Sequence, residues 1–222
     1  IDCKLNDAPE AYRRAVAQIK YDPLSVGALV TAHKINLLNA ARDMFDALDP
    51  HALTCGEVSS ISKRGEALWG HAKDPITSGL SLDAVIGKDY FARTGAEIVC
   101  FGAGGSAVAL AAHLAAKTDP GDRPRRVIVV NRSQGRLDHL KLVVDQLGAD
   151  ILFEYVLNAD PARNDQIMAA APEGSIIINA TGMGKDIPGS PITNAGQFPL
   201  RAVAWELNYR GELDFWHQAM EQ

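Results

Sequence analysis

Hydrophobic and polar positions in the first part of the chain predict a mixture of helices and short strands. Tyr12, Val16 and Ile19 recur at helical spacing after a proline, which predicts a helix over residues 9–20. The same reasoning predicts a strand at 27–31, helices at 34–48 and 74–86, and a β-hairpin with strands at 57–62 and 67–71. An Asp-Pro pair ends the second helix at 49–50, and another opens the third at 74–75.

The pattern changes after residue 94, where apolar runs begin to alternate with helices. The apolar runs predict strands at residues 97–101, 126–130, 151–156, 175–179 and 203–206. Helices are predicted up to residue 117 and over 133–147, 161–171 and 212–221. Such alternation is typical of a parallel sheet that is covered by helices on both faces. The polar residues 87–95 are predicted to connect two domains.

A glycine-rich turn joins the strand at 97–101 to the helix that follows it. The turn comprises Gly102, Ala103, Gly104, Gly105 and Ser106. Gly102 permits a tight turn, Gly104 lets backbone amides approach a pyrophosphate, and the helix N-terminus favours a negative charge. A strand before the turn and a helix after it predict a dinucleotide site; the alternative is a glycine turn without a ligand.

The end of the second strand of this region indicates which dinucleotide would bind. An NAD site places an acidic residue there, whereas this chain has Asn131, Arg132 and Ser133, with Arg136 one helical turn further on. A guanidinium and a hydroxyl bind a 2′-phosphate that a carboxylate would repel. We therefore predict NADP as the cofactor; the alternative for Arg132 is a solvated surface arginine.

Composition narrows the class of protein further. The 222 residues are 47% hydrophobic and 22% charged, which is typical of a globular protein with one large or two small domains. A net charge of −5 without a basic block argues against nucleic acid and membranes as partners. The three widely spaced cysteines predict neither disulfides nor a metal site and fit a cytoplasmic location.

Motifs along nearly the whole chain resemble those of the shikimate dehydrogenase family. Residues 30–34 (Val-Thr-Ala-His-Lys) are similar to Val-Thr-x-Pro-x-Lys, and 56–60 (Gly-Glu-Val-Ser-Ser) to Gly-Ala-Val-Asn-Thr. Residues 70–75 (Gly-His-Ala-Lys-Asp-Pro) are similar to Gly-x-Asn-Thr-Asp-Gly. The glycine turn and Asn-Arg-Ser at 131–133 resemble the family's NADP-binding pair of motifs.

Two motifs near the C-terminus extend the resemblance in the same order. Residues 179–183 resemble Asn-Ala-Thr-Ser followed by Gly-Met, and Glu206, Tyr209 and Gly211 stand like Asp-x-x-Tyr-x-Pro. The turn at 179–184 ends the fourth strand of the parallel sheet, at the edge where a nicotinamide would lie. Cofactor contacts are therefore expected from Thr181, Gly182 and Met183; the alternative is a plain strand-ending turn.

The resemblance implies that Lys34 and Asp74 act together on the hydroxyl that is oxidised. An ammonium can donate a proton to the oxygen that gains charge during hydride transfer, and a carboxylate can orient it. The resemblance also implies substrate contacts from Thr31, Ser59 and Tyr209. From the residues alone, the alternatives are a solvated lysine for Lys34 and a helix N-cap for Asp74.

The implied protein is an α/β enzyme with a Rossmann-type doubly wound parallel sheet, a smaller α/β substrate domain and a cleft between them. Residues 1–93 would bind substrate, 94–210 would bind NADP, and a helix in 211–222 would return to the first domain. The implied reaction is reversible NADPH-dependent reduction of 3-dehydroshikimate, or of a related cyclic keto carboxylate, in aromatic amino acid biosynthesis. The expected enzyme is a monomer or homodimer whose partner is a small-molecule substrate.

Departures from the family motifs leave two alternatives open. The spacing between Thr31 and Lys34 is one residue shorter than in the family, Ser59 replaces an asparagine, and Lys73 adds a cation that suits a carboxylate-bearing substrate. The alternatives are a dehydrogenase for quinate, aminoshikimate or another polyol, and a non-catalytic NADP(H)-binding sensor or docking protein. The family's carboxylate-binding serines would precede Ile1, so we expect these 222 residues by themselves to bind NADPH and to turn over slowly.

Overall fold

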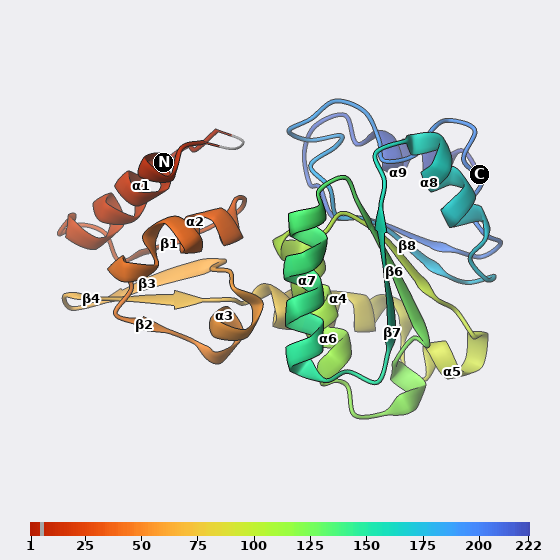
Figure 1. Ribbon diagram of the computed structural model, residues 1–222, viewed down its shortest axis with the longest axis horizontal. Helices are drawn as coiled ribbons and strands as arrows, with labels where there is room; N and C mark the ends of the chain where they lie inside the picture. Colours follow the sequence, from red (N-terminus) through yellow and green to blue (C-terminus); the bar gives the residue numbers. More distant parts are fainter. Residues whose placement is uncertain (5–6) are drawn as a thin grey trace. The chain divides into compact units, whose positions relative to one another are not determined.

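The computed structural model describes residues 1–4 and 7–222, which divide into two compact units, 1–78 and 79–222 (Figure 1). The division falls inside helix α4 (Asp74–Ile86), upstream of the connection expected at 87–95. Asp83 ties the second half of α4 to α6 (Gly105–Ala116), because its carboxylate lies 3.1 Å from His113 Nε2 and 2.8 Å from Lys117 Nζ. Because these contacts attach the second half of α4 to the second unit, the boundary between the units precedes the one expected at 87–95.

The expected connection at 87–95 itself contains a short helix. Helix α5 (Tyr90–Thr94) buries Phe91, and the Tyr90 hydroxyl donates a hydrogen bond to the Gly174 carbonyl at 2.6 Å. These two aromatic residues attach the segment to the second unit. In the described part of the chain, no helix is both long enough and apolar enough to cross a membrane.

The sheet of the first unit has the strand order β1-β3-β4-β2. Strand β1 (Gly27–Leu29) is antiparallel to β3 (Ser60–Arg64), β3 is antiparallel to β4 (Ala67–His71), and β4 is parallel to β2 (Ala47–Leu48). The predicted β-hairpin is confirmed, and Gly65 takes the left-handed conformation (φ +62°) that its tight turn needs.

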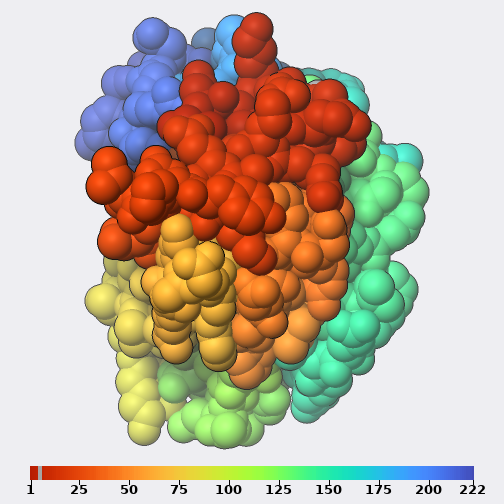
Figure 2. Space-filling view, turned by 90° about the vertical axis from the view of Figure 1, so that its left-hand side faces the viewer, coloured from red at the N-terminus to blue at the C-terminus, as the bar shows by residue number. Residues whose placement is uncertain are grey.

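Helices α1 (Pro9–Tyr21) and α2 (Lys34–Ala41) pack together on one face of this sheet. Figure 2 shows α1 in red above the light-orange hairpin of β3 and β4. Val16 from α1 and Leu38 from α2 are buried with Ile61 and Leu68 in one hydrophobic core. This core supports the start of α2, where Lys34 stands, and the end of β4, which is followed closely by Asp74.

The helix predicted over 34–48 ends at Ala41, which corrects the sequence interpretation. A 3₁₀ turn, η1 (Arg42–Met44), and strand β2 follow. Asp46 holds β2 against β4, since its backbone N–H donates to the Leu68 carbonyl (2.9 Å) and its carboxylate accepts from the Leu68 N–H (2.7 Å). These hydrogen bonds between distant segments hold residues 47–48 in a strand, although the apolar residues of this segment have helical spacing.

The Asp-Pro pair at 49–50 begins a helix instead of ending one. Helix α3 (Pro50–Cys55) starts with proline in its first turn, and Asp49 Oδ1 accepts a hydrogen bond from the Ala52 N–H at 2.7 Å. This is the geometry of an N-cap, for which aspartate is well suited. The helix ends at Gly56, whose φ of +62° turns the chain away.

The second unit contains the parallel sheet that the sequence predicted, in the order β7-β6-β5-β8-β9. Its strands are β5 (Ile98–Phe101), β6 (Arg126–Asn131), β7 (Leu152–Leu157), β8 (Ile176–Asn179) and β9 (Val203–Glu206). The strand order reverses at β5, between β6 and β8, and ligands of such sheets bind outside the carboxyl ends of the strands at that point.

Helices cover both faces of this sheet (Figure 1). Helices α6 and α7 (Gln134–Leu147) lie on one face, and α8 (Pro161–Ala169) and α9 (Asp214–Met220) lie on the other. The loop between α6 and β6 contains a short 3₁₀ turn, η2 (Pro120–Asp122). The doubly wound arrangement is therefore confirmed for the second unit.

The C-terminal helix differs from the expectation that residues 211–222 return to the first domain. Phe215 of α9 is only 1% exposed and packs in the core of the second unit with Val99, Ile177 and Met168. Its ring also meets Phe198 at 5.5 Å between centroids. Helix α9 belongs to the second unit because this aromatic side chain fills one face of the parallel sheet.

Candidate active site

The glycine turn lies at the carboxyl end of β5, the central strand of the parallel sheet. Gly102 has φ +112°, and its N–H donates a hydrogen bond to the Val130 carbonyl at 2.8 Å. A Cβ at this position would lie 2.5 Å from the Ala180 carbonyl oxygen. The turn therefore passes so close to the end of β8 that only glycine fits.

Gly104 is a different kind of glycine, because the space beside it is open. Among the described residues other than its own chain neighbours, none has a heavy atom within 4 Å of the position that its Cβ would occupy. It stands just before the first turn of α6 with no side-chain cap, and that turn holds no acidic residue. Gly105 and Ser106 are partly exposed. Free backbone N–H groups of a helix N-terminus beside open space are suited to a phosphate.

The loop after β6 presents an arginine to solvent. Asn131 Nδ2 donates to the Ser133 carbonyl at 3.2 Å and closes the turn that carries Arg132. Arg132 and Ser133 are exposed, and within the described residues the Arg132 guanidinium has no ion-pair partner. Arg136 lies in the first turn of α7 and is partly buried. The role of these residues toward a 2′-phosphate stays a prediction.

Asn179 organises the turn at the end of β8 that carries Thr181, Gly182 and Met183. It is fully buried, and its Nδ2 donates to the Met183 carbonyl (3.2 Å) and to Glu206 Oε2 (2.8 Å). Its Oδ1 accepts from the backbone N–H (3.1 Å) and the hydroxyl (2.6 Å) of Thr181. Burial raises the pKa of Glu206, while hydrogen bonds from Asn208 and Asn179 oppose that rise.

This asparagine–glutamate contact is a feature of the candidate site that the sequence interpretation did not include. Asn179 and Glu206 are register partners at the carboxyl ends of the parallel strands β8 and β9. The sequence did contain a signal for this contact: each of these two apolar strands ends in a polar residue. Tyr209 lies beyond β9, is 65% exposed and has Lys185 Nζ 5.2 Å from its ring centroid.

Lys34 and Asp74 form an ion pair in the first unit, although 40 residues separate them in sequence. Their side chains are 13% and 21% exposed. His33, at φ +59°, turns the chain directly into α2, so that Lys34 is the first helical residue despite the short spacing from Thr31. The structure therefore brings together the two residues that the resemblance implied as catalytic. Thr31 itself is exposed.

Asp74 is not the N-cap that was considered as its alternative role. The Lys73 carbonyl accepts the first helical hydrogen bond, from the Thr77 N–H at 3.0 Å, so Lys73 caps α4 and Asp74 is the first residue inside it. A carboxylate in the first turn still interacts favourably with the helix dipole. Its hydrogen bond, however, is to Lys34.

Ser59 is 1% exposed and uses its hydroxyl to hold the segment that precedes Asp74. Its Oγ accepts from the Lys73 N–H at 2.7 Å and donates to the His71 carbonyl at 3.4 Å. These contacts make Ser59 a structural support of the ion pair. Its predicted contact with substrate stays a prediction.

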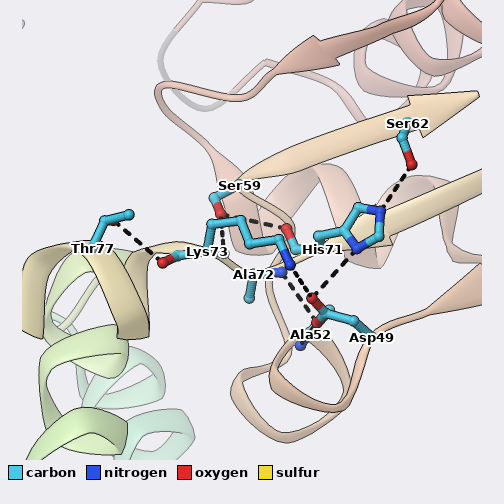
Figure 3. A network of polar contacts seen from close by, with 8 residues as sticks. All are labelled: Asp49, Ala52, Ser59, Ser62, His71, Ala72, Lys73 and Thr77. Carbon is cyan, nitrogen blue, oxygen red and sulfur yellow. Dashed lines mark hydrogen bonds and ion pairs between the residues drawn. The ribbon is translucent and has the colours of Figure 1, made fainter.

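Asp49 connects the same region to α3 (Figure 3). Its Oδ2 lies 3.3 Å from Lys73 Nζ and 3.4 Å from His71 Nδ1, and His71 Nε2 lies 2.9 Å from Ser62 Oγ. Burial acts to raise the pKa of Asp49, but hydrogen bonds from two backbone N–H groups and the contact with Lys73 lower it overall. Asp49 stays ionised, so the Lys73 cation already has an anionic partner.

Glu57 is a buried acidic residue near the ion pair that the sequence interpretation did not single out. Burial raises the pKa of its carboxyl to about 8; the Lys34 charge acts to lower this pKa and the Asp74 charge acts to raise it. The available signal was the glutamate itself, which stands where the resembling motif has alanine.

The fold and these residues define the class: an α/β protein whose first unit carries a lysine–aspartate pair and whose second unit is of the Rossmann type. No protein-family profile matches the chain. A shikimate dehydrogenase (NADP(+)) of Symbiobacterium thermophilum is 28% identical over 204 residues, which cover 91% of this chain and 64% of that protein. The chain spans less than two thirds of the length of the curated relatives it matches.

Solved structures show the same fold. The shikimate dehydrogenase of Aquifex aeolicus aligns with a TM-score of 0.65 at 20% identity, over 96% of this chain and 69% of that one. Quinate dehydrogenase of Corynebacterium glutamicum, in complex with NAD, aligns with a TM-score of 0.64 at 18% identity, over 97% and 69% of the two chains. The sequence similarities to curated shikimate dehydrogenases support the interpretation of this chain as a divergent member of that family.

Proposed function

We propose that this chain carries the cofactor-binding and proton-transfer residues of an NADP-dependent dehydrogenase that interconverts 3-dehydroshikimate and shikimate. The observation that carries the proposal is the ion pair between Lys34 and Asp74, each the first residue of its helix. A largely shielded lysine held by a carboxylate is a suitable acid–base group for a carbonyl and hydroxyl couple. The sequence similarity to curated NADP-dependent shikimate dehydrogenases supports the same assignment.

The two residues have distinct tasks in the proposed reduction. NADPH, when bound, supplies the hydride. The Lys34 ammonium donates a proton to the carbonyl oxygen as negative charge develops on it, and Asp74 holds Lys34 Nζ in position. Because both side chains are mostly shielded from water, their interaction is stronger than it would be at the surface. In the oxidation direction, Lys34 accepts the proton.

We assign three segments of the second unit to the cofactor. The amides around Gly104 would bind the pyrophosphate, and Arg132 with Ser133 would bind the 2′-phosphate. The turn of Thr181, Gly182 and Met183, fixed by Asn179, would contact the nicotinamide. The open space at Gly104 and the unpaired guanidinium of Arg132, within the described residues, support this assignment.

Replacing Arg132 by alanine is expected to weaken NADPH binding and to leave NADH binding unchanged. Loss of a charge-assisted hydrogen bond to the 2′-phosphate costs about 1.5–3 kcal/mol, or roughly ten- to hundredfold in affinity. Calorimetric titration with both cofactors measures the effect. Arg125→Ala is the matched control, because Arg125 is also exposed but precedes β6 at its opposite end. Equal affinity of the unmodified protein for the two cofactors would contradict the NADP assignment.

A substrate panel tests the reaction. We expect NADPH oxidation, followed by its absorbance, with 3-dehydroshikimate, and NADP⁺ reduction with shikimate. A preference for quinate or an aminated analogue would identify the second candidate function. Its supporting observation is Ser59, which replaces the family's asparagine and has its hydroxyl engaged with Lys73 and His71. Tight NADPH binding without any turnover would indicate a binding protein instead.

A further inference from the structure

Glu57 is an acidic side chain that the proposed reaction does not use. It is 0% exposed, and within the described residues neither of its carboxyl oxygens has a hydrogen-bond partner. Burying a carboxylate without partners costs far more than burying a neutral carboxylic acid. Glu57 therefore carries its proton at neutral pH, in agreement with a pKa that burial raises to about 8.

The two residues that follow Glu57 are hydrogen-bonded to Lys34 and to the residue that precedes Asp74. Val58 donates its N–H to the Lys34 carbonyl at 3.4 Å. The Ser59 hydroxyl accepts the N–H of Lys73, the residue directly before Asp74, at 2.7 Å. Glu57 is thus fixed relative to the first residue of α2 and to the first residue of α4.

The titratable and charged groups that act on Glu57 come from each neighbouring helix. Lys34 of α2 favours its ionisation, and Asp74 of α4 opposes it. Cys55 of α3 responds to Glu57 in turn, since burial and then the charges of Glu57, Asp49 and Asp74 raise the pKa of its thiol to about 12. Cys55 remains a neutral thiol, so Glu57, Lys34 and Asp74 form the coupled set.

We propose that Glu57 is a third proton-binding residue of the Lys34–Asp74 site, neutral in the working protein, whose ionisation makes the site net negative and weakens its binding of an anionic substrate. With Glu57 neutral, the ammonium and the carboxylate of the ion pair cancel. Loss of the Glu57 proton to solvent leaves one negative charge, which repels a carboxylate-bearing substrate and holds the Lys34 proton more tightly. Glu57 acts through Lys34 and is a positioning residue.

The proton on Glu57 can be tested without any enzymatic activity. Because its pKa in the folded protein (about 8) exceeds the ordinary value of 4.5, the stabilisation is complete below the ordinary value and is lost as pH rises toward 8. Urea unfolding should show the unfolding equilibrium constant rising by up to about tenfold per pH unit in this window. In Glu57→Gln this contribution should be absent.

Controls make the unfolding result specific to Glu57. Glu66→Gln removes an exposed carboxyl from the same unit, in the hairpin turn, and should retain the pH dependence of the unmodified protein. Carboxyl-carbon NMR of the unmodified protein needs no variant and should show Glu57 titrating near pH 8. Titration of Glu57 at its ordinary pKa, or identical pH dependence in Glu57→Gln and the unmodified protein, would overturn the proposal. If Glu57→Gln does not fold, Glu57→Met takes its place.

The effect on substrate rests on the proposed function and is measured separately. Above pH 8, KM for 3-dehydroshikimate should rise by up to about tenfold per pH unit in the unmodified protein and stay level in Glu57→Gln. The same rise in both proteins would overturn the substrate effect. Absence of turnover in every protein would refute the proposed function, while the unfolding and NMR results would still decide whether Glu57 holds a proton.

Discussion

Replacing Lys34 by alanine is expected to lower kcat by about 10²–10⁴-fold, the range that a positioned proton donor contributes. NADPH affinity should not change, because Lys34 lies in the first unit and the cofactor segments lie in the second. Steady-state rates and a cofactor titration separate the two effects. Lys20→Ala is the matched control: Lys20 is also ion-paired, with Asp46, and is similarly shielded in the same unit (17% exposed).

Asp74→Asn distinguishes a catalytic carboxylate from one that only supports a helix. Since Lys73 caps α4, the helix does not need the Asp74 carboxylate, and asparagine keeps the shape of the side chain. We expect α4 to stay folded and kcat to fall, because the ion pair with Lys34 is lost. Near-normal turnover in Lys34→Ala would remove the pair from the mechanism and would favour a non-catalytic NADP(H)-binding protein.

The second unit was predictable from sequence because its signals are local. Each apolar run from 97–101 onward became a strand of the parallel sheet, including the short one at 203–206. The first unit contains an error of secondary structure at 34–48, where helical spacing continues past Ala41. Pairing of Ala47 and Leu48 with β4 is a contact between distant segments, which spacing cannot report.

The candidate site was predictable only where a motif carried it. Lys34 and Asp74 were paired through their resemblance to a family, since nothing in local spacing relates residues 40 positions apart. Glu57 was missed because it stands among Gly, Val and Ser in a segment that gives no sign of burial. Its burial depends on the packing of α2, α3 and α4, which is a property of the folded unit.

Two substitutions in the glycine turn are expected to differ strongly in their effect on stability. Gly102→Ala should lower the free energy of unfolding by roughly 2–5 kcal/mol, because its Cβ would meet the Ala180 carbonyl at 2.5 Å and φ is +112°. Gly104→Ala should leave stability nearly unchanged, because Gly104 has φ −87° and ψ −168°, which alanine tolerates. Urea unfolding of both variants measures the difference.

The same pair tests where the cofactor lies. Open space beside Gly104 is where we place the pyrophosphate, so a methyl group there should weaken NADPH binding by at least about tenfold, as one lost charge-assisted hydrogen bond would. A folded, stable Gly104→Ala variant with poor NADPH affinity would separate ligand contact from structural damage, which Gly102→Ala cannot do. If that variant binds NADPH as tightly as the unmodified protein, the pyrophosphate does not approach this turn, and the assignment of the glycine segment fails.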